Sequence, residues 1–270
     1  MTDDATRPLR DVRVVSMALN VPGPLAVQRL AAEGATVVKI EPPSGDPLLG
    51  MSPEWYAELH RDVRVERVDL KRNEGRERLQ VLLHDADIFL SSQRPASLAR
   101  LGLDSASLGA VRWVNIVGDC AEPEVAGHDL TYQARAGLLG ESMPPSLFAD
   151  VMGSERAFAA VVMLLRQPAG ARAEVGLYDS LTPLLAPLKH GVTATGGILG
   201  GGLPAYRIYP TRNGRCAIAA LEPHFRARLY QALNLAPETP LDDAMLARTA
   251  EEWEQWARER DLPIAAVRTA

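Results

Sequence analysis

The chain has 270 residues, of which 47% are hydrophobic and 23% are charged, and its formal net charge is −5. This composition is typical of a globular protein with one large domain or two smaller ones, whose core needs no metal or disulfide. The acidic balance excludes the broad basic surface that nucleic-acid binding requires. The only two cysteines, Cys120 and Cys216, lie far apart without metal-ligand spacing, which indicates reduced structural thiols and no metal site.

No targeting segment or membrane span is expected. Residues 1–4 lack the basic and then apolar pattern of a signal peptide. No uninterrupted apolar run reaches the ~18 residues that indicate a membrane-spanning helix. The sequence therefore predicts a cytoplasmic protein that does not bind membranes.

Strand and helix patterns alternate over the first part of the chain. The apolar run 12–17 predicts a buried strand, Pro24 suits the first turn of the helix that follows, and Gly34 suits its end. Such β-α alternation indicates an α/β fold with a doubly wound, largely parallel, Rossmann-like sheet. Ligands of these sheets bind beyond the carboxyl ends of the strands. The predicted strands are 12–17, 36–40, 63–70, 87–90 and 113–117, and the predicted helices are 24–34, 74–84 and 97–101.

The second part of the chain predicts a smaller α+β domain. The glycine-rich stretch 191–203 indicates a domain boundary, so we predict domains over 1–190 and 191–270. Asn213-Gly214 between two apolar runs predicts a β-hairpin. The predicted helices of the smaller domain are 223–233 and 250–260, and its hairpin strands are 206–209 and 215–219. The larger domain has two further predicted helices before the boundary, 130–139 and 151–166.

Three residues suited to proton transfer lie far apart in the chain: His128, Asp150 and Glu222. A histidine titrates near neutral pH, and a histidine with carboxylates in one pocket can remove and return a proton at carbon. Each residue also has an ordinary explanation. His128 fits a solvated loop, Asp150 fits the cap of a helix that opens directly after it, and Glu222 fits a helix start before Pro223. Asp129 could cap the helix that follows it, and the helix N-terminus beside Asp150 would favour its charged form.

Basic residues and glycines give weaker signals. Lys71, Arg94 and Arg100 could hold the phosphates of an anionic ligand, although isolated basic residues are usually solvated. The loop 21–24 is not a G-x-G-x-x-G sequence, so dinucleotide binding has little support. Zinc-site spacing, a Walker loop and a G-x-S-x-G elbow are all missing from the sequence.

Taken together and in order, these segments resemble CoA-transferase family III (the CaiB/BaiF type), and in particular its α-methylacyl-CoA racemase branch. The sequence Gly127-His128-Asp129-Leu130 is similar to the racemase motif, and formyl-type transferases tend to have tyrosine at the histidine position. The segment that ends in Asp150 is similar to one that the whole family shares. The segments that carry the resemblance are 8–15, 22–24, 34–43, 68–71, 85–103, 127–132, 144–150, 201–209 and 220–225.

The resemblance implies roles for the candidate residues. His128 and Asp150 would be the two catalytic acid/bases, and Glu222 would orient His128; in a transferase, Asp150 would instead be the nucleophile. Coenzyme A would be part of an acyl-CoA substrate and not a separate cofactor, with Lys71, Arg94 and Arg100 contacting its phosphates and adenosine. Backbone N–H groups at the start of the helix at 151–166 could stabilise an enolate oxygen. A homodimer is expected.

Three hypotheses about function follow. The first is a racemase or epimerase that exchanges the α-proton of a 2-methylacyl-CoA thioester by two-base 1,1-proton transfer through an enolate. The second is a CoA-transferase that moves CoA between carboxylic acids. The third is an acyl-CoA-binding protein without turnover, suggested by the departure from the racemase pattern over 170–180 and by a C-terminal domain shortened relative to the family.

Overall fold

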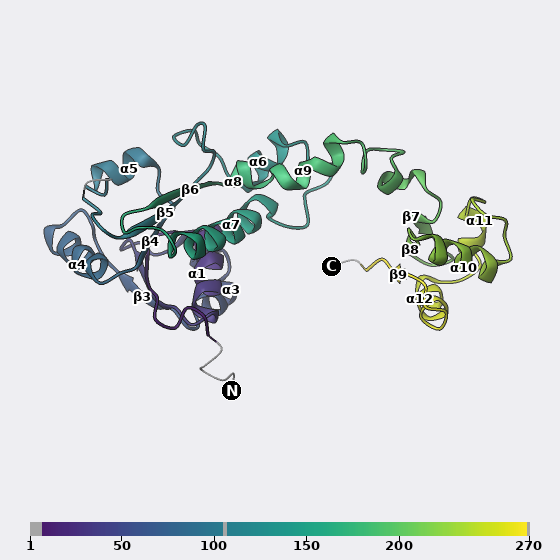
Figure 1. Ribbon diagram of the computed structural model, residues 1–270, viewed down its shortest axis with the longest axis horizontal. Helices are drawn as coiled ribbons and strands as arrows, with labels where there is room; N and C mark the ends of the chain where they lie inside the picture. Colours follow the sequence, from purple (N-terminus) through teal and green to yellow (C-terminus); the bar gives the residue numbers. More distant parts are fainter. Residues whose placement is uncertain (1–6, 105–106, 269–270) are drawn as a thin grey trace. The chain divides into compact units, whose positions relative to one another are not determined.

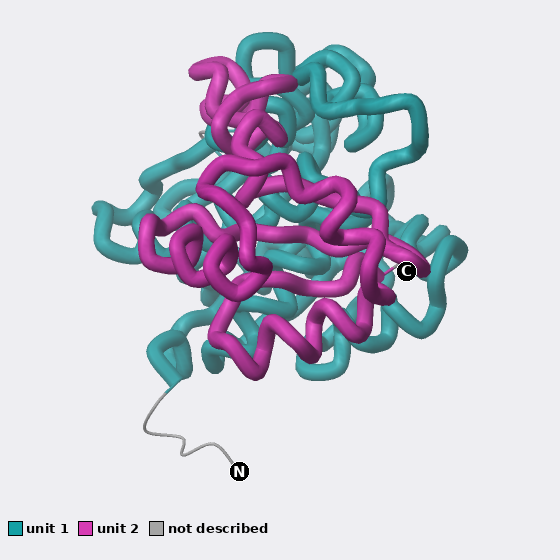
Figure 2. Tube along the Cα trace, turned by 90° about the vertical axis from the view of Figure 1, so that its right-hand side faces the viewer, with its two compact units in different colours: residues 1–183 teal, residues 184–270 magenta. Residues whose placement is uncertain are grey.

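The computed structural model describes residues 7–104 and 107–268. Residues 1–4, on which the signal-peptide prediction depends, lie outside this part. The chain divides into two compact units, residues 1–183 and 184–270 (Figure 2), and each is described by itself. The first unit therefore ends within helix α9 (Thr182–Lys189), whereas the predicted boundary after residue 190 follows that helix.

The first unit is built on a six-stranded parallel sheet with the strand order β3-β2-β1-β4-β5-β6. Four of these strands, β3, β4, β5 and β6, are labelled in Figure 1. All five strand pairings are parallel. The chain direction across the sheet reverses between β1 and β4, so the predicted doubly wound α/β fold is confirmed. The strands are β1 (Arg13–Ser16), β2 (Thr36–Glu41), β3 (Arg64–Arg67), β4 (Ile88–Ser91), β5 (Arg112–Val117) and β6 (Arg172–Gly176).

Helices cover both faces of this sheet because successive side chains of each strand point to opposite faces. In β1, Val14 packs in one core with α1 and α7, and Val15 packs in the other core with α4 and α5. Both cores are apolar, which explains why the central strands β1, β4 and β5 are mostly hydrophobic. The helices are α1 (Pro22–Ala32), α2 (Pro47–Met51), α3 (Pro53–Leu59), α4 (Asn73–His84), α5 (Pro95–Arg100), α6 (Asp129–Arg135), α7 (Phe148–Leu164) and α8 (Leu177–Ser180).

Several elements differ from the sequence prediction. Helix α6 ends at Arg135, four residues before the predicted end, and α7 begins at Phe148, three residues before the predicted start. Strand β6 was not predicted, because its sequence Arg-Ala-Glu-Val-Gly alternates charged and small residues instead of forming an apolar run. It lies at the edge of the sheet and pairs only with β5.

The second unit is a smaller α+β structure around an antiparallel sheet with the order β7-β8-β9. The predicted hairpin is confirmed, with Pro210 paired to Arg215 and Gly214 at φ +91°, a conformation that favours glycine. Its core includes Tyr209, Trp253 and Trp256. The elements are a short π-helical turn (Ile198–Gly202), β7 (Tyr206–Pro210), β8 (Arg215–Ala219), α10 (Pro223–Leu233), α11 (Asp242–Met245), α12 (Ala250–Arg258) and β9 (Ile264–Ala266). Within the described residues, every helix is too short or too polar to cross a lipid bilayer.

Candidate active site

A cleft of about 240 Å³ lies at the carboxyl edge of the parallel sheet, where β1, β4 and β5 end. The strand order of the sheet reverses between β1 and β4, and ligands of doubly wound folds bind beyond the carboxyl ends of the strands at such a reversal. His128 and Asp150, 22 positions apart, both line this cleft. The other lining residues are Leu19, Asn20, Pro22, Ser92, Arg94, Ile116, Val117, Gly118, Pro123, Val125, Gly127, Tyr132 and Leu177.

His128 lies immediately before helix α6, at an exposed position. Its backbone N–H donates to the Thr131 hydroxyl at 3.0 Å, and that hydroxyl donates to the His128 carbonyl at 2.7 Å. The Thr131 N–H also donates to the same carbonyl, at 2.8 Å. These bonds fix the backbone of the loop that carries His128 at the point where helix α6 begins.

Asp150 lies in the first turn of α7 and is half-buried. The prediction that the helix opens directly after it is wrong, because α7 already begins at Phe148. Burial, and secondly the negative charge of Asp129, raise the pKa of the Asp150 carboxyl to about 7. The expectation that the helix N-terminus favours the charged form is therefore also wrong, since desolvation outweighs it. A carboxyl group with such a pKa can both accept and donate a proton at neutral pH.

The carboxylate of Asp129, the first residue of α6, contacts the backbone at the start of α7. Its Oδ1 accepts the N–H of Ala149 at 2.7 Å and that of Asp150 at 3.1 Å. The N–H of Val151 donates to the Leu147 carbonyl within the helix turn. The prediction that these amides stabilise an enolate oxygen is wrong, because Asp129 and the helix itself accept their hydrogen bonds. Asp129 thus caps α7 and not, as expected, the helix that follows it in sequence.

Tyr132 closes one side of the cleft, and its side chain packs against two glycines. Tyr132 is buried, and a Cβ atom at Gly118 would lie 2.1 Å from its hydroxyl oxygen. A Cβ atom at Gly127 would lie 2.5 Å from the same oxygen. The two glycines therefore allow the tyrosine ring to reach the cleft between β5 and the His128 loop.

We expect Gly118→Ala to force Tyr132 out of its position and to destabilise the protein by about 1–3 kcal/mol, as overpacking in a dense core does. Thermal or urea denaturation measures this change. Gly140→Ala is the matched control, because a Cβ at Gly140 meets no atom within 4 Å. Equal stability of the two variants would contradict the packing role of Gly118.

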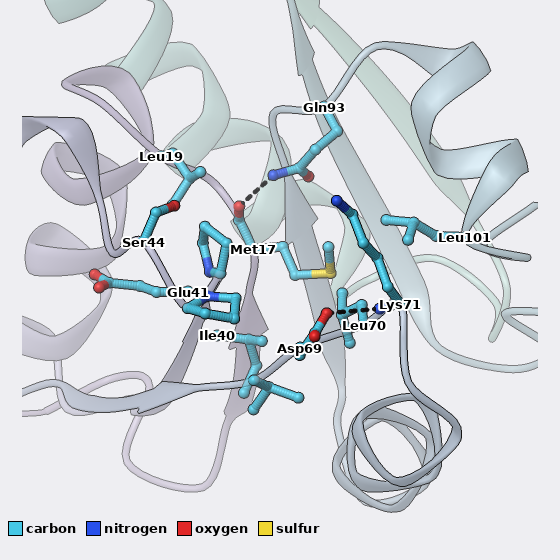
Figure 3. Close-up of a pocket in the computed structure, with 13 residues that line it drawn as sticks. Met17, Leu19, Ile40, Glu41, Ser44, Asp69, Leu70, Lys71, Gln93 and Leu101 are labelled. Carbon is cyan, nitrogen blue, oxygen red and sulfur yellow. Dashed lines mark hydrogen bonds between the residues drawn. The ribbon is translucent and has the colours of Figure 1, made fainter.

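A second cavity, of about 480 Å³, lies at the same edge of the sheet (Figure 3). Its walls are mainly apolar, and Lys71 extends along one side toward Gln93, whose amide donates to the Met17 carbonyl at 2.6 Å. Leu19 lines both this cavity and the His128–Asp150 cleft. The remaining lining residues are Ile40, Glu41, Pro42, Pro43, Ser44, Val68, Asp69, Leu70 and Leu101.

The other predicted site residues lie in three different places. Arg94 lines the His128–Asp150 cleft. Arg100 lies on α5, donates to the Ser97 hydroxyl at 2.8 Å and lines neither of the two cavities. Glu222 precedes α10 in the second unit, so its predicted role beside His128 stays a prediction. Over residues 7–104 and 107–268, no group of three or more His, Cys, Asp or Glu side chains is arranged to hold a metal ion.

The profile of CoA-transferase family III matches residues 9–270. The chain belongs to this family. It is 30% identical over 87% of its length to a succinyl-CoA–D-citramalate CoA-transferase of Chloroflexus aurantiacus. It is 31% identical over 85% of its length to an alpha-methylacyl-CoA racemase of Mus musculus. The chain spans about two thirds of these relatives, 67% of the transferase and 66% of the racemase. Its relatives therefore include proteins named for each of the two reaction types.

Solved structures of family III proteins have the same fold. A hypothetical protein of Mycobacterium tuberculosis superposes with a TM-score of 0.83 at 22% identity, over 98% of this chain and 86% of that protein. A CaiB/BaiF family protein of Brucella suis superposes with a TM-score of 0.78 at 21% identity, over 98% of this chain and 85% of that protein. These likenesses support the family III fold.

Proposed function

We propose that this family III protein is an acyl-CoA racemase or epimerase that transfers the α-proton of a 2-methylacyl-CoA thioester. His128 and Asp150 would be the two acid/bases. The observation that carries this proposal is that the two residues line one cleft, with the pKa of Asp150 raised to about 7. Glu222 is proposed to orient His128, and a homodimer is proposed from the resemblance to the family.

The chemistry needs two groups of similar proton affinity. One base removes the α-proton, and the electron pair of the C–H bond moves into an enolate whose negative charge lies on the thioester oxygen. The conjugate acid of the other base then donates a proton to the opposite face of the same carbon. A carboxyl group with a pKa of about 7, such as that of Asp150, is partly ionised at neutral pH, so it can remove the proton in one direction and donate it in the other.

A CoA-transferase is the second candidate, because the Chloroflexus aurantiacus relative is named as one. In that reaction the ionised carboxylate of Asp150 would attack the thioester carbonyl and release the CoA thiolate. A pKa of about 7 leaves a large fraction of this carboxyl group protonated at neutral pH. Protonation lowers the fraction of the ionised form that can attack as a nucleophile, whereas an acid/base uses both forms. The raised pKa therefore supports proton transfer over acyl transfer.

The neighbouring cavity supports a proposal for where CoA binds. The apolar cavity beside Lys71 is about 480 Å³, and Leu19 lines it together with the acid/base cleft. We propose that the adenosine and phosphates of CoA bind there, with Lys71 as a cationic contact, and that the thioester arm passes Leu19 to the cleft. Arg94, which lines the cleft, is proposed as a second cationic contact. Arg100 is proposed as a contact at the outer rim, from the family resemblance.

The test is incubation of the protein with a single epimer of a 2-methylacyl-CoA in deuterated water, with and without an acceptor carboxylic acid. We expect deuterium at the α-carbon and loss of configuration without any acceptor. Strict dependence of turnover on the acceptor would instead support CoA transfer. Binding of the thioester without either reaction would contradict both enzymatic proposals and support an acyl-CoA-binding protein.

A further inference from the structure

We propose that Asp129 is a positioning residue for the acid/base pair, an inference that rests on the proposed function. Its buried carboxylate holds the helix turn that carries Asp150 against the loop that carries His128. The sequence motif places Asp129 next to His128, and the fold places its side chain on the backbone of Asp150.

The hydrogen bonds of Asp129 show how it joins the two segments. The residue is only 4% exposed, and its Oδ1 accepts the N–H groups of Ala149 and Asp150. Its Oδ2 accepts the Gln133 amide at 2.5 Å. The buried Gln133 also donates to the Ser146 carbonyl at 3.1 Å. One carboxylate therefore fixes the end of the loop that precedes α7 as well as the first turn of α7.

All three donors to Asp129 are neutral amides, and no cation donates to this carboxylate among the hydrogen bonds and ion pairs of the described residues. Its negative charge therefore remains next to Asp150. This charge is the second cause, after burial, of the raised pKa of Asp150. Asp129 thus has two effects on Asp150: the hydrogen bonds set its position, and the charge sets how readily it keeps a proton.

Other titratable or charged groups near Asp150 come from several elements. His128, Arg94 and Tyr132 line the same cleft, and the charge of Asp150 contributes to the raised pKa of Tyr132, after desolvation. Further along α7, two side chains are held by neighbouring elements: Glu155 pairs with Arg29 of α1 at 2.8 Å, and Arg156 donates to the Asp179 carbonyl of α8 at 2.9 Å. Asp129 is the carboxylate that contacts the backbone of Asp150 directly.

Asp129→Asn is the test variant, because it keeps an oxygen that can accept the two α7 amides and removes the charge. Among the described residues, the side-chain oxygen of Gln133 has no hydrogen-bond partner, so rotation of this amide can offer an acceptor to the new Asn NH₂ group. We expect the titration midpoint of Asp150, measured by carboxyl carbon NMR, to move to lower pH by about one unit. The limb of the pH profile of α-proton exchange that reports Asp150 should move by the same amount, with KM unchanged.

Asp129→Ala separates position from charge. It removes the amide acceptor as well, so we expect kcat for exchange to fall by a further factor of about 10–100 beyond the Asn variant. Glu155→Gln is the matched control, because it removes one negative charge from α7 where Arg29 pairs with it, and the Asp150 midpoint should not move. If Asp129→Asn does not fold, as judged by circular dichroism, Asp129→Ser replaces it as an uncharged helix cap.

The NMR titration keeps this inference separate from the proposed function. A wild-type protein that exchanges no α-proton with any thioester would contradict the racemase proposal. The titration midpoint of Asp150 in wild type and in Asp129→Asn would still test whether the charge of Asp129 raises the pKa of Asp150. An unchanged midpoint in Asp129→Asn, or a wild-type midpoint near the ordinary aspartate value, would overturn the role of Asp129.

Discussion

Asp150→Asn is expected to lower racemisation of a 2-methylacyl-CoA by a factor of about 10²–10⁴, the usual contribution of one acid/base group. The amide keeps the size of the carboxyl group but can neither remove nor donate a proton. His128 is unchanged in this variant and can still remove the α-proton from the epimer that presents it to the imidazole. We therefore expect slow deuterium exchange into one epimer only, and His128→Asn should leave exchange into the other epimer.

The same substitution is expected to raise stability above pH 7. The pKa of Asp150 is about 7 in the folded protein and ~3.9 in an unfolded chain, so the folded state retains this proton between those values. Retention of this proton stabilises the folded state fully below pH ~4, and this stabilisation is lost as the pH rises to 7. The free energy of unfolding then falls by at most about 1.4 kcal/mol for each unit between the two pKa values. Asparagine has no ionisation to lose, so the variant should unfold at higher temperature than wild type at pH 8 and near the wild-type temperature at pH 4.

Thermal midpoints at the two pH values measure this effect. Asp11→Asn is the control, because the Asp11 side chain is 91% exposed. A variant at position 150 that is no more stable than wild type at pH 8 would show that its carboxyl is not held in a desolvating site. Exchange into both epimers by Asp150→Asn would contradict its role as one of two bases.

The parallel sheet could be predicted because it follows from local patterns and one topological rule, whereas the placement of His128 and Asp150 in one cleft was implied by the resemblance to the family. Apolar runs such as 12–17 specify buried strands, and loops at the carboxyl ends of parallel strands meet at one edge. The order of the motifs then indicated the family. These inferences needed no knowledge of individual side-chain contacts.

The electrostatics of the site could not be predicted in the same way. The sequence alone indicated that a helix N-terminus would lower the pKa of Asp150, but the structure shows that burial and Asp129 raise it. Asp129 lies 21 positions before Asp150, and its capping of α7 depends on how two helices pack. The signal that was available is a carboxylate next to a candidate catalytic histidine, which in sequence also fits the cap of its own helix.

Lys39 is another residue whose environment depends on tertiary contacts. In the sequence it interrupts the apolar strand β2 and would ordinarily face solvent. In the structure it is fully buried, with Nζ 3.1 Å from Glu41 Oε1, 2.5 Å from Asp46 Oδ2 and 2.9 Å from His60 Nε2. The Nδ1 atom of His60 lies 2.6 Å from the Tyr56 carbonyl, which leaves Nε2 as the acceptor for the ammonium group.

Lys39→Met is therefore expected to lower the free energy of unfolding by about 3–5 kcal/mol, because two buried carboxylates lose their cation. The effect should extend to the cleft. Asp46 Oδ1 also accepts the backbone N–H of Asn20 at 3.1 Å, and Asn20 lines the cleft with the left-handed φ of +64°. Urea denaturation measures the loss, and Lys189→Met, at an exposed position on α9, is the control with an expected change within about 0.5 kcal/mol. A Lys39→Met protein as stable as this control would contradict the stabilising role of the buried ion pairs.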